Sequence, residues 1–380
     1  MAFERGILSS IFNKNKNDNI NDDDGNYKFR CSDQERNFFE NGSMFLEDLI
    51  AFSNGKYNTS IRRFSIQELS QATNGFCSHQ IVLVGGRDIY KIYNGSFDKR
   101  QILIKKHNDS QLRSNAKSEA IRDMVITSLM SSHKNVLKLI GCCLEFDIPA
   151  SVYEYAGGGR IELLKNGLYK SEGGMAENGG SPSLTWNSRL KIANDIAYAV
   201  TYMHTAFSTP IIHRDLKPSK IIIDQSGVAK LLDFSLSISI PPGETQVEVK
   251  RIVGTYGYMD MEYALNGILT EKSDVYSFGV ILLALLTGKK PLDKPCDINQ
   301  YYLLEWVRHY VEKDQFNEIV DPRILKERGG IEQEQQLQAV LALALRCTQE
   351  KKEDRPEMID VTKELRQMLK SDCANSSTQP

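Results

Sequence analysis

The sequence predicts an α+β protein of two lobes, in which a small β-rich lobe precedes a larger, mainly helical one. Three observations support this. The chain has 380 residues, more than one hydrophobic core usually serves. Short strand-like runs crowd between residues 80 and 155. Runs with helical periodicity dominate from residue 186 onward.

The N-terminal residues 1–60 are predicted to form an extension that is partly disordered. Residues 13–26 are almost entirely Asn, Asp and Lys, without apolar periodicity, which favours disorder. A helix is expected near residues 38–50, where apolar side chains recur with helical spacing. This helix either packs on its own lobe or binds a partner. For a partner we expect the contacts to come from Phe45, Leu46, Leu49 and Ile50.

The small lobe is predicted over residues 61–156 and the large lobe over 157–370. The small lobe should hold strands near 80–84, 89–94, 101–106, 137–144 and 149–155 and a helix near 115–131. The large lobe should hold helices near 186–206, 273–287, 300–312, 334–348 and 356–370. The small, polar residues 371–380 are expected to be a disordered tail.

Composition excludes some classes of partner. Lys plus Arg number 47 and Asp plus Glu 49, for a formal net charge of -2, so we expect no nucleic-acid partner. The seven cysteines are scattered without metal-ligand spacing, which indicates reduced intracellular thiols. The apolar run 280–286 is far shorter than the roughly 20 residues that cross a bilayer. We therefore expect a cytoplasmic protein without a transmembrane segment.

Five segments carry the strongest resemblance to a known family. His213-Arg214-Asp215-Leu216-Lys217-Pro218-Ser219-Lys220 resembles the catalytic loop of protein kinases. Asp233-Phe234-Ser235 resembles their metal-binding DFG element, and residues 259–262 resemble the APE element. Residues 273–279 and 354–356 follow in the same order as in kinases. The resemblance implies a bilobal protein-kinase fold.

Upstream segments narrow the resemblance to plant receptor-like kinases. Residues 64–69, 72–76 and 139–145 resemble wall-associated kinases and their relatives. Among receptor-like cytoplasmic kinases of that group, the chain is most similar to the ZED-type or RKS-type immune pseudokinases. They share a short N-terminal extension, an eroded glycine loop and Asp-x-Glu in place of Ala-Pro-Glu.

Several catalytic positions are retained. The resemblance implies that Asp215 accepts the substrate proton and that Lys217 lies beside the transferred phosphate. It implies a metal ligand at Asp233. It also implies ATP-binding positions at Gly85, Lys105, Glu154 and Ala156. Asp215 could instead be kept only to hold the shape of the loop.

Other nucleotide-handling positions are eroded. Lys220 replaces the asparagine that would be the second metal ligand, and a lysine has no acceptor atom. The glycine-loop pattern begins at Gly85 but has Arg87 and Tyr90 where glycines should lie. Ser235 replaces the DFG glycine. We therefore expect ATP and Mg²⁺ to bind weakly or not at all.

The ion pairs of the fold are less certain from sequence. The helix glutamate that should pair with Lys105 falls on Met124, and Asp123 is one carbon shorter and rotated by about 100° around the helix. This pair is therefore in doubt. Glu262 and Arg355 match the buried ion pair of the family. Asp274 is expected to cap a helix and, by resemblance, to bind catalytic-loop backbone.

The resemblance implies a pseudokinase adaptor or decoy in plant innate immunity. Its expected partners are the leucine-rich-repeat domain of an NLR receptor, other receptor-like cytoplasmic kinases and a bacterial effector. Partners would recruit it to the plasma membrane. The alternative is a weakly active ATP-dependent Ser/Thr protein kinase, because Lys105, Asp215 and Asp233 are all present. A nucleotide-binding switch without phosphate transfer is a third reading.

Overall fold

The computed structural model describes residues 32–53, 55, 61–85, 89–108, 114–155, 162–169, 184–292, 302–327 and 329–375. They form two compact units. The first takes its residues from 1–132 and 137–155, and the second from 133–136 and 156–380. Among the described residues, no helix is long and apolar enough to cross a membrane.

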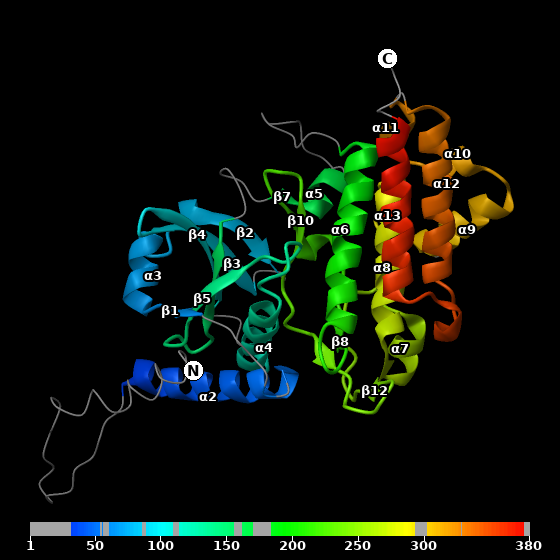
Figure 1. Cartoon of the computed structure of the whole chain (residues 1–380). Helices are drawn as coiled ribbons and strands as arrows, with labels where there is room; N and C mark the ends of the chain where they lie inside the picture. Colours follow the sequence, from blue (N-terminus) through cyan, green and yellow to red (C-terminus); the bar gives the residue numbers. More distant parts are fainter. Residues whose placement is uncertain are drawn as a thin grey trace, which may run out of the picture. The chain divides into compact units, whose positions relative to one another are not determined.

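The first unit is built on a six-stranded sheet in the order β1-β5-β6-β4-β3-β2 (Figure 1). Its strands are β1 (Arg62–Arg63), β2 (Ile81–Gly85), β3 (Tyr90–Phe97), β4 (Arg100–His107), β5 (Leu139–Cys143) and β6 (Ala150–Glu154). All neighbours are antiparallel except β1, which runs parallel to β5. The central strand β4 is buried from Ile102 to Lys105, which fixes Lys105 in the interior of this unit.

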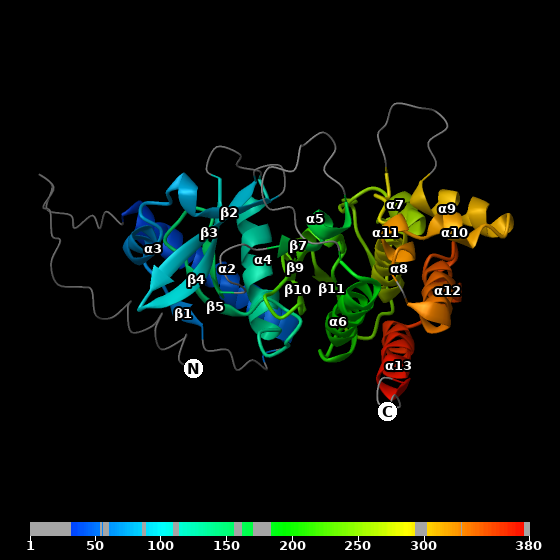
Figure 2. The same ribbon diagram turned by 90° about the horizontal axis from the view of Figure 1, so that it is seen from above.

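Helices cover this sheet. They are α2 (Asp33–Ser53), α3 (Ile66–Ala72), the short 3-10 helix η1 (Ser78–Gln80) and α4 (Ala116–Leu129). A capping box begins α3, because Ser65 accepts from the Glu68 backbone and Glu68 accepts from the Ser65 backbone. Helices α2 and α4 pack against each other (Figure 2). Helix α2 therefore packs within the first unit.

The buried face of α2 corrects one prediction. Phe45 and Leu49 are each 1% exposed, so they belong to the core of their own unit and their predicted role as partner-binding residues is wrong. Leu46 is half-buried and Ile50 is 53% exposed. The correction follows from helix geometry, because the two pairs lie on different sides of one helix.

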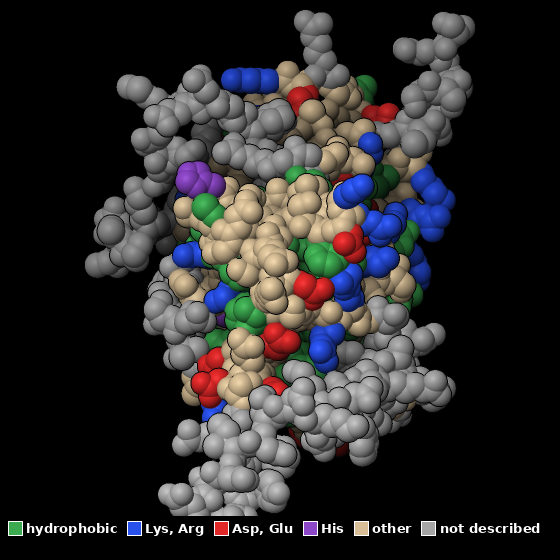
Figure 3. Space-filling view, turned by 90° about the vertical axis from the view of Figure 1, so that its left-hand side faces the viewer, with side chains coloured by type: hydrophobic (Ala, Val, Ile, Leu, Met, Phe, Trp, Pro, Cys, Tyr) green, Lys and Arg blue, Asp and Glu red, His purple; other side chains and the backbone are tan. Residues whose placement is uncertain are grey.

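A polar anchor also holds α2 in place. Asn41 is fully buried, and its side-chain Nδ2 donates to the backbone carbonyls of Leu144 and Phe146, both at 2.9 Å. These hydrogen bonds satisfy one buried and one part-buried carbonyl, groups that are costly to bury without a partner. Seen from the side of the first unit, exposed hydrophobic side chains lie singly among polar and charged ones (Figure 3).

The second unit is mainly helical. Its helices are α5 (Leu164–Leu168), α6 (Trp186–Thr205), α7 (Met261–Asn266), α8 (Glu271–Thr287), α9 (Leu303–Glu312), α10 (Phe316–Ile319), α11 (Pro322–Leu325), α12 (Gly330–Cys347) and α13 (Met358–Asn375), with 3-10 helices η3 (Pro218–Lys220) and η4 (Lys352–Asp354). Buried throughout its apolar run, α8 forms the centre. Helix α13 continues to Asn375, so the predicted disorder is wrong for residues 371–375, and residues 376–380 lie outside the described part.

Short strands complete this unit. They are β7 (Glu162–Leu163), β8 (Ile211–Ile212), β9 (Ile221–Ile223), β10 (Ala229–Leu231), β11 (Ile238–Ser239), β12 (Val247–Glu248) and β13 (Ile268–Leu269). They pair as β10-β9-β7, β11-β8 and β12-β13. Strands β8 to β10 frame the loop that carries Asp215 and Lys220.

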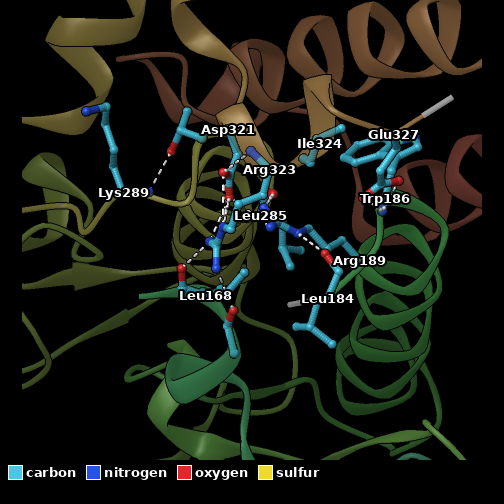
Figure 4. A network of polar contacts seen from close by, with 12 residues as sticks. Leu168, Leu184, Trp186, Arg189, Leu285, Lys289, Asp321, Arg323, Ile324 and Glu327 are labelled. Carbon is cyan, nitrogen blue, oxygen red and sulfur yellow. Dashed lines mark hydrogen bonds and ion pairs between the residues drawn. The ribbon is translucent and has the colours of Figure 1, made fainter. Parts of the chain in front are cut away.

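A buried charge network ties the helices of the second unit together (Figure 4). Arg189 of α6 is fully buried; its Nη2 lies 2.8 Å from Asp321 Oδ2, and its Nη1 donates to the Leu285 carbonyl of α8 at 2.8 Å. Arg323 of α11 also pairs with Asp321. Burial alone would raise the pKa of Asp321, but the two guanidinium groups hold it below its usual value.

Candidate functional site

Lys105 has the acidic partner that the sequence left in doubt. Its Nζ lies 2.8 Å from Asp123 Oδ2 of α4, and both side chains are at most 2% exposed. The Tyr153 hydroxyl donates to the same carboxylate oxygen at 3.2 Å. Counting along the chain had pointed to Met124, which is also fully buried. Position 123 of α4 is the one that reaches Lys105, so the ion pair is present with aspartate in place of glutamate.

Tyr90 covers the Lys105 ammonium. The Lys105 Nζ lies 4.1 Å from the centre of the Tyr90 ring, a cation–π contact. A Cβ added to Gly85 would overlap this ring. Glycine at position 85 thus makes room for Tyr90, where in a kinase glycines let backbone approach a phosphate. A phosphate could reach the ammonium from this side only if Tyr90 moved away.

Two predicted nucleotide residues, Arg87 and Ala156, cannot be placed, whereas Glu154 can. Arg87 and Ala156 lie outside the residues that the structure describes. Glu154 ends β6, and its backbone N–H donates to the Lys138 carbonyl at 2.9 Å. Its role in nucleotide binding stays a prediction.

In the second unit, Lys220 bridges two aspartates. Its Nζ lies 2.7 Å from Asp233 Oδ2 and 3.1 Å from Asp215 Oδ2. Lys220 is 8% exposed, so the bridge is shielded from water. Lys220 therefore places a positive charge between two carboxylates. In a kinase, one of these carboxylates binds metal and the other accepts the substrate proton.

Asp215 is engaged on both carboxylate oxygens. Lys217 Nζ lies 2.9 Å from its Oδ2, and the Thr255 hydroxyl donates to its Oδ1 at 2.6 Å. Burial alone would raise the pKa of Asp215, but Lys220, Lys217 and the Thr255 hydroxyl together hold it below the ordinary value. A carboxylate with a lowered pKa and two cations in contact is a weak proton acceptor.

These residues do not fit a magnesium ion. Mg²⁺ requires near-octahedral oxygen ligands, whereas Lys220 offers only N–H donors. At about 4 Å its charge would repel a cation by several kcal/mol at an intermediate dielectric. Within the described part of the chain, no group of three or more His, Cys, Asp or Glu side chains is arranged to hold a metal. The Asp233 carboxylate is thus paired with the Lys220 ammonium.

The backbone of the catalytic loop is nevertheless well supported. Asp274 is fully buried and accepts hydrogen bonds from the backbone N–H groups of His213 at 2.7 Å and Arg214 at 3.0 Å. Asp274 had been expected to cap α8, but this prediction is wrong because Thr270 is the N-cap of that helix. Asp274 lies one turn inside the helix, and from there it reaches the loop.

The buried ion pair of the large lobe uses a different acid from the one expected. Arg355 donates from Nη1 and Nη2 to the two oxygens of Asp260, both at 2.9 Å. Glu262 instead pairs with Lys352 at 2.9 Å, so the predicted Glu262–Arg355 pair is wrong. Asp260 is also the N-cap of α7, which turns its side chain inward while Glu262 remains partly exposed. The Asp-x-Glu motif in the sequence was the signal that could have predicted this exchange of Glu262 for Asp260 as the partner of Arg355.

The activation segment, residues 235–258, is fastened at several points. Arg214 donates to the carbonyls of Leu236 and Arg251 and to the Tyr263 hydroxyl. The Tyr258 and Tyr169 hydroxyls lie 2.9 Å apart. The Arg214 guanidinium and the Tyr169–Tyr258 hydroxyl pair therefore hold the segment in place.

The hydroxyls of the segment differ in access. Ser237 is fully buried and Thr255 is bound to Asp215. Ser239 is half-buried and Thr245 is exposed, while Tyr256 is 77% exposed. Tyr256 and Thr245 are therefore the accessible candidates for modification.

Comparison with known proteins gives a consistent assignment. A family profile described as protein tyrosine and serine/threonine kinase matches residues 84–365. The chain is 42% identical over 332 residues to the Arabidopsis thaliana protein named Non-functional pseudokinase ZED1, covering 86% of this chain and 94% of that one. It is 41% identical over 347 residues to Serine/threonine-protein kinase ZRK1 of the same plant, covering 90% and 95%. Putative wall-associated receptor kinase-like 16 is 34% identical over 336 residues, covering 87% and 72%.

Proposed function

The chain belongs to the protein-kinase family, as a ZED-type member of the wall-associated-kinase-like group, and from this we propose that it is a pseudokinase adaptor in plant innate immunity. Protein kinases in general use ATP and Mg²⁺. In this chain we propose that both bind weakly or not at all and that recognition has replaced phosphate transfer.

The Lys220 bridge is the observation that carries this proposal. A kinase needs one aspartate free to accept a proton and another free to hold metal. Here one ammonium contacts both Asp215 and Asp233 within 3.1 Å. Tyr90 against Lys105 is an independent obstacle in the other unit.

The proposed partners are the leucine-rich-repeat domain of an NLR receptor, other receptor-like cytoplasmic kinases and a bacterial effector. We propose that the chain works in the cytoplasm and that partners bring it to the plasma membrane. The second unit offers a surface for a kinase or an effector around the activation segment. Its exposed apolar side chains are Ile252, Tyr256, Met261 and Leu265, between 39% and 77% exposed.

The test of catalysis is an autophosphorylation assay on the purified full chain with labelled ATP and Mg²⁺. We expect no incorporation above that of the Asp215→Asn variant. Incorporation that disappears in Asp215→Asn would overturn the pseudokinase assignment.

A second candidate function is weak Ser/Thr kinase activity. The intact Lys105–Asp123 pair favours it, because an active small lobe requires that pair. The two candidates give different results for Lys105→Met. A weak kinase loses its activity, whereas an adaptor has no activity to lose and keeps its partners if the variant stays folded.

A further inference from the structure

A polar pocket of about 360 Å³ lies in the first unit, between the end of α3 and the hairpin of β3 and β4. Lys105, Tyr90 and Asp123 are not among its lining residues, so it is separate from the positions that handle nucleotide in a kinase. Its volume falls near the lower end of the roughly 300–1,000 Å³ of small-molecule sites. Six of its lining side chains are polar and uncharged, namely Gln71, Asn74, Gln80, Asn94, Ser96 and Gln101.

The polar pocket lies at a stretch of β3 where the sheet is incomplete. Residues 94–97 of β3 pair with β4 on one side, whereas β2 pairs only with the residues from Tyr90 to Tyr93. Within the described residues, the outer edge of this stretch therefore has no neighbouring strand. A strand edge of this kind presents backbone N–H and C=O groups, which add to the hydrogen-bonding groups of the polar side chains.

The walls of the polar pocket are held in place. A Cβ added to Gly95 would lie 3.2 Å from the Ala72 carbonyl oxygen, so glycine at this position lets the end of α3 close on β3. The Thr73 hydroxyl accepts from the Phe76 backbone N–H at 3.0 Å, and it holds the turn in which Asn74 has a φ of 50°. A site that is formed before its ligand arrives loses less conformational entropy on binding.

The lining limits the chemistry of a ligand. None of the eight lining residues is charged or aromatic, so a phosphate or carboxylate group would lack a counter-charge and a flat ring would lack a stacking partner. Each side-chain amide offers two N–H donors and one carbonyl acceptor. The Asn94 Oδ1 atom is buried and has no hydrogen-bond partner among the described residues. A ligand of the polar pocket must therefore be uncharged and able both to donate and to accept hydrogen bonds.

We propose that the polar pocket binds an uncharged polyhydroxylated molecule of the size of a mono- or disaccharide. A hydroxyl both donates and accepts, so neighbouring hydroxyls can pair with the side-chain amides and donate to Asn94 Oδ1. An extended peptide fits less well, because the free edge of four residues is shorter than the usual strand of about five to six. The bound molecule would tie α3 to the hairpin of β3 and β4. This binding is independent of the proposed adaptor function.

The test is saturation-transfer difference NMR on the purified full chain with glucose, myo-inositol, sucrose or trehalose, each at about 10 mM. The method detects the protons of the bound ligand, so it separates binding from the general stabilisation that excluded sugars give to any protein. We expect transfer to at least one of the four probes, with a dissociation constant on the order of 1 mM.

Two variants locate the site. Asn94→Leu with Gln101→Leu removes two amides at nearly unchanged size, and the loss of two hydrogen bonds should weaken binding about tenfold or more. Ser96→Trp should fill the polar pocket from an exposed position and abolish transfer, which keeps the inference testable should the double variant disturb the fold. The matched control is Gln338→Leu, an exposed amide on α12, which should bind as the unchanged chain does. Thermal melting confirms that each variant is folded.

Three outcomes overturn the inference. Absence of transfer to all four probes would remove the saccharide site and leave the adaptor function standing. Transfer that persists in folded Ser96→Trp and in the double variant would place the bound sugar elsewhere on the chain. Transfer to N-acetyl-triglycine amide, an uncharged peptide probe, without transfer to any sugar would show that the polar pocket recognises a peptide backbone.

Discussion

Among the described residues, each unit contains one buried lysine. Active kinases have the first of these lysines, whereas the second replaces a residue that they need. Lys105 pairs with Asp123, as a kinase requires, yet Tyr90 lies over its ammonium. Lys220 stands where a kinase has a neutral metal ligand, and it contacts both remaining aspartates. In the first unit the catalytic pair is kept and covered, whereas in the second the catalytic carboxylates are kept and neutralised. Both arrangements keep the fold and place a side chain of the protein against a position that handles nucleotide or metal in a kinase.

The largest expected effect is the loss of the acid beside Lys105. Asp123→Ala would leave an ammonium that is 2% exposed without its carboxylate, which typically costs about 3–5 kcal/mol. Urea unfolding at neutral pH measures this cost. Asp147→Ala, a matched change at an exposed aspartate, should cost less than about 1 kcal/mol, and equal losses for the two variants would show that the Lys105 pair adds nothing.

Removing the second lysine should cost less. Lys220→Met would leave Asp215 with Lys217 and Thr255, so we expect a loss of about 2–3 kcal/mol. The same urea titration compares the two lysine centres directly. If Lys220→Met lost more unfolding free energy than Asp123→Ala, the predicted order of the two effects would be wrong.

At these sites the sequence predicted the departures in residue type but not the contacts that the side chains make. The side chains at positions 90 and 220 are the wrong types for a kinase, and that much could be read from the printed sequence. The sequence could not show that Tyr90 covers Lys105 or that Lys220 contacts both aspartates, because those contacts depend on side-chain direction across elements far apart in the chain.

Helix rotation explains the other differences. The partner of Lys105 depends on which side of α4 faces β4, and one residue shifts that direction by about 100°. The same reasoning separates the buried Phe45 and Leu49 from the outward Leu46 and Ile50. The strands, the main helices and the catalytic loop were predictable because periodicity and motif order are local signals.

A metal site should appear when the second lysine is replaced by the family residue. Lys220→Asn removes the ammonium and supplies a side-chain oxygen beside Asp233, so Mn²⁺ should bind. At a concentration 100 times the dissociation constant, binding stabilises by about 2.7 kcal/mol. The melting temperature of the variant should rise in millimolar Mn²⁺, while that of Lys220→Met should not. A rise in the unchanged chain would show that Lys220 does not exclude metal.

The smallest effect concerns acid stability. Because the folded pKa of Asp215 is below its ordinary value, its contribution is fully present above the unfolded pKa of about 3.9 and is lost as pH falls through the folded pKa. Asp321 acts in the same direction. In Lys220→Met the pKa of Asp215 should rise, so its acid transition should begin at a higher pH than in the unchanged chain. Circular dichroism between pH 6 and 2 detects the difference, and coincident transitions would count against the charge coupling.

The most direct measurement is the melting temperature of the full chain with and without about 5 mM ATP and Mg²⁺. If the chain's own side chains occupy the nucleotide-handling positions, the unchanged chain should show no shift, and the double variant Tyr90→Gly with Lys220→Asn should melt several degrees higher with ligand than without. A shift of several degrees in the unchanged chain would contradict this and return nucleotide binding, with or without phosphate transfer, to the centre of its function.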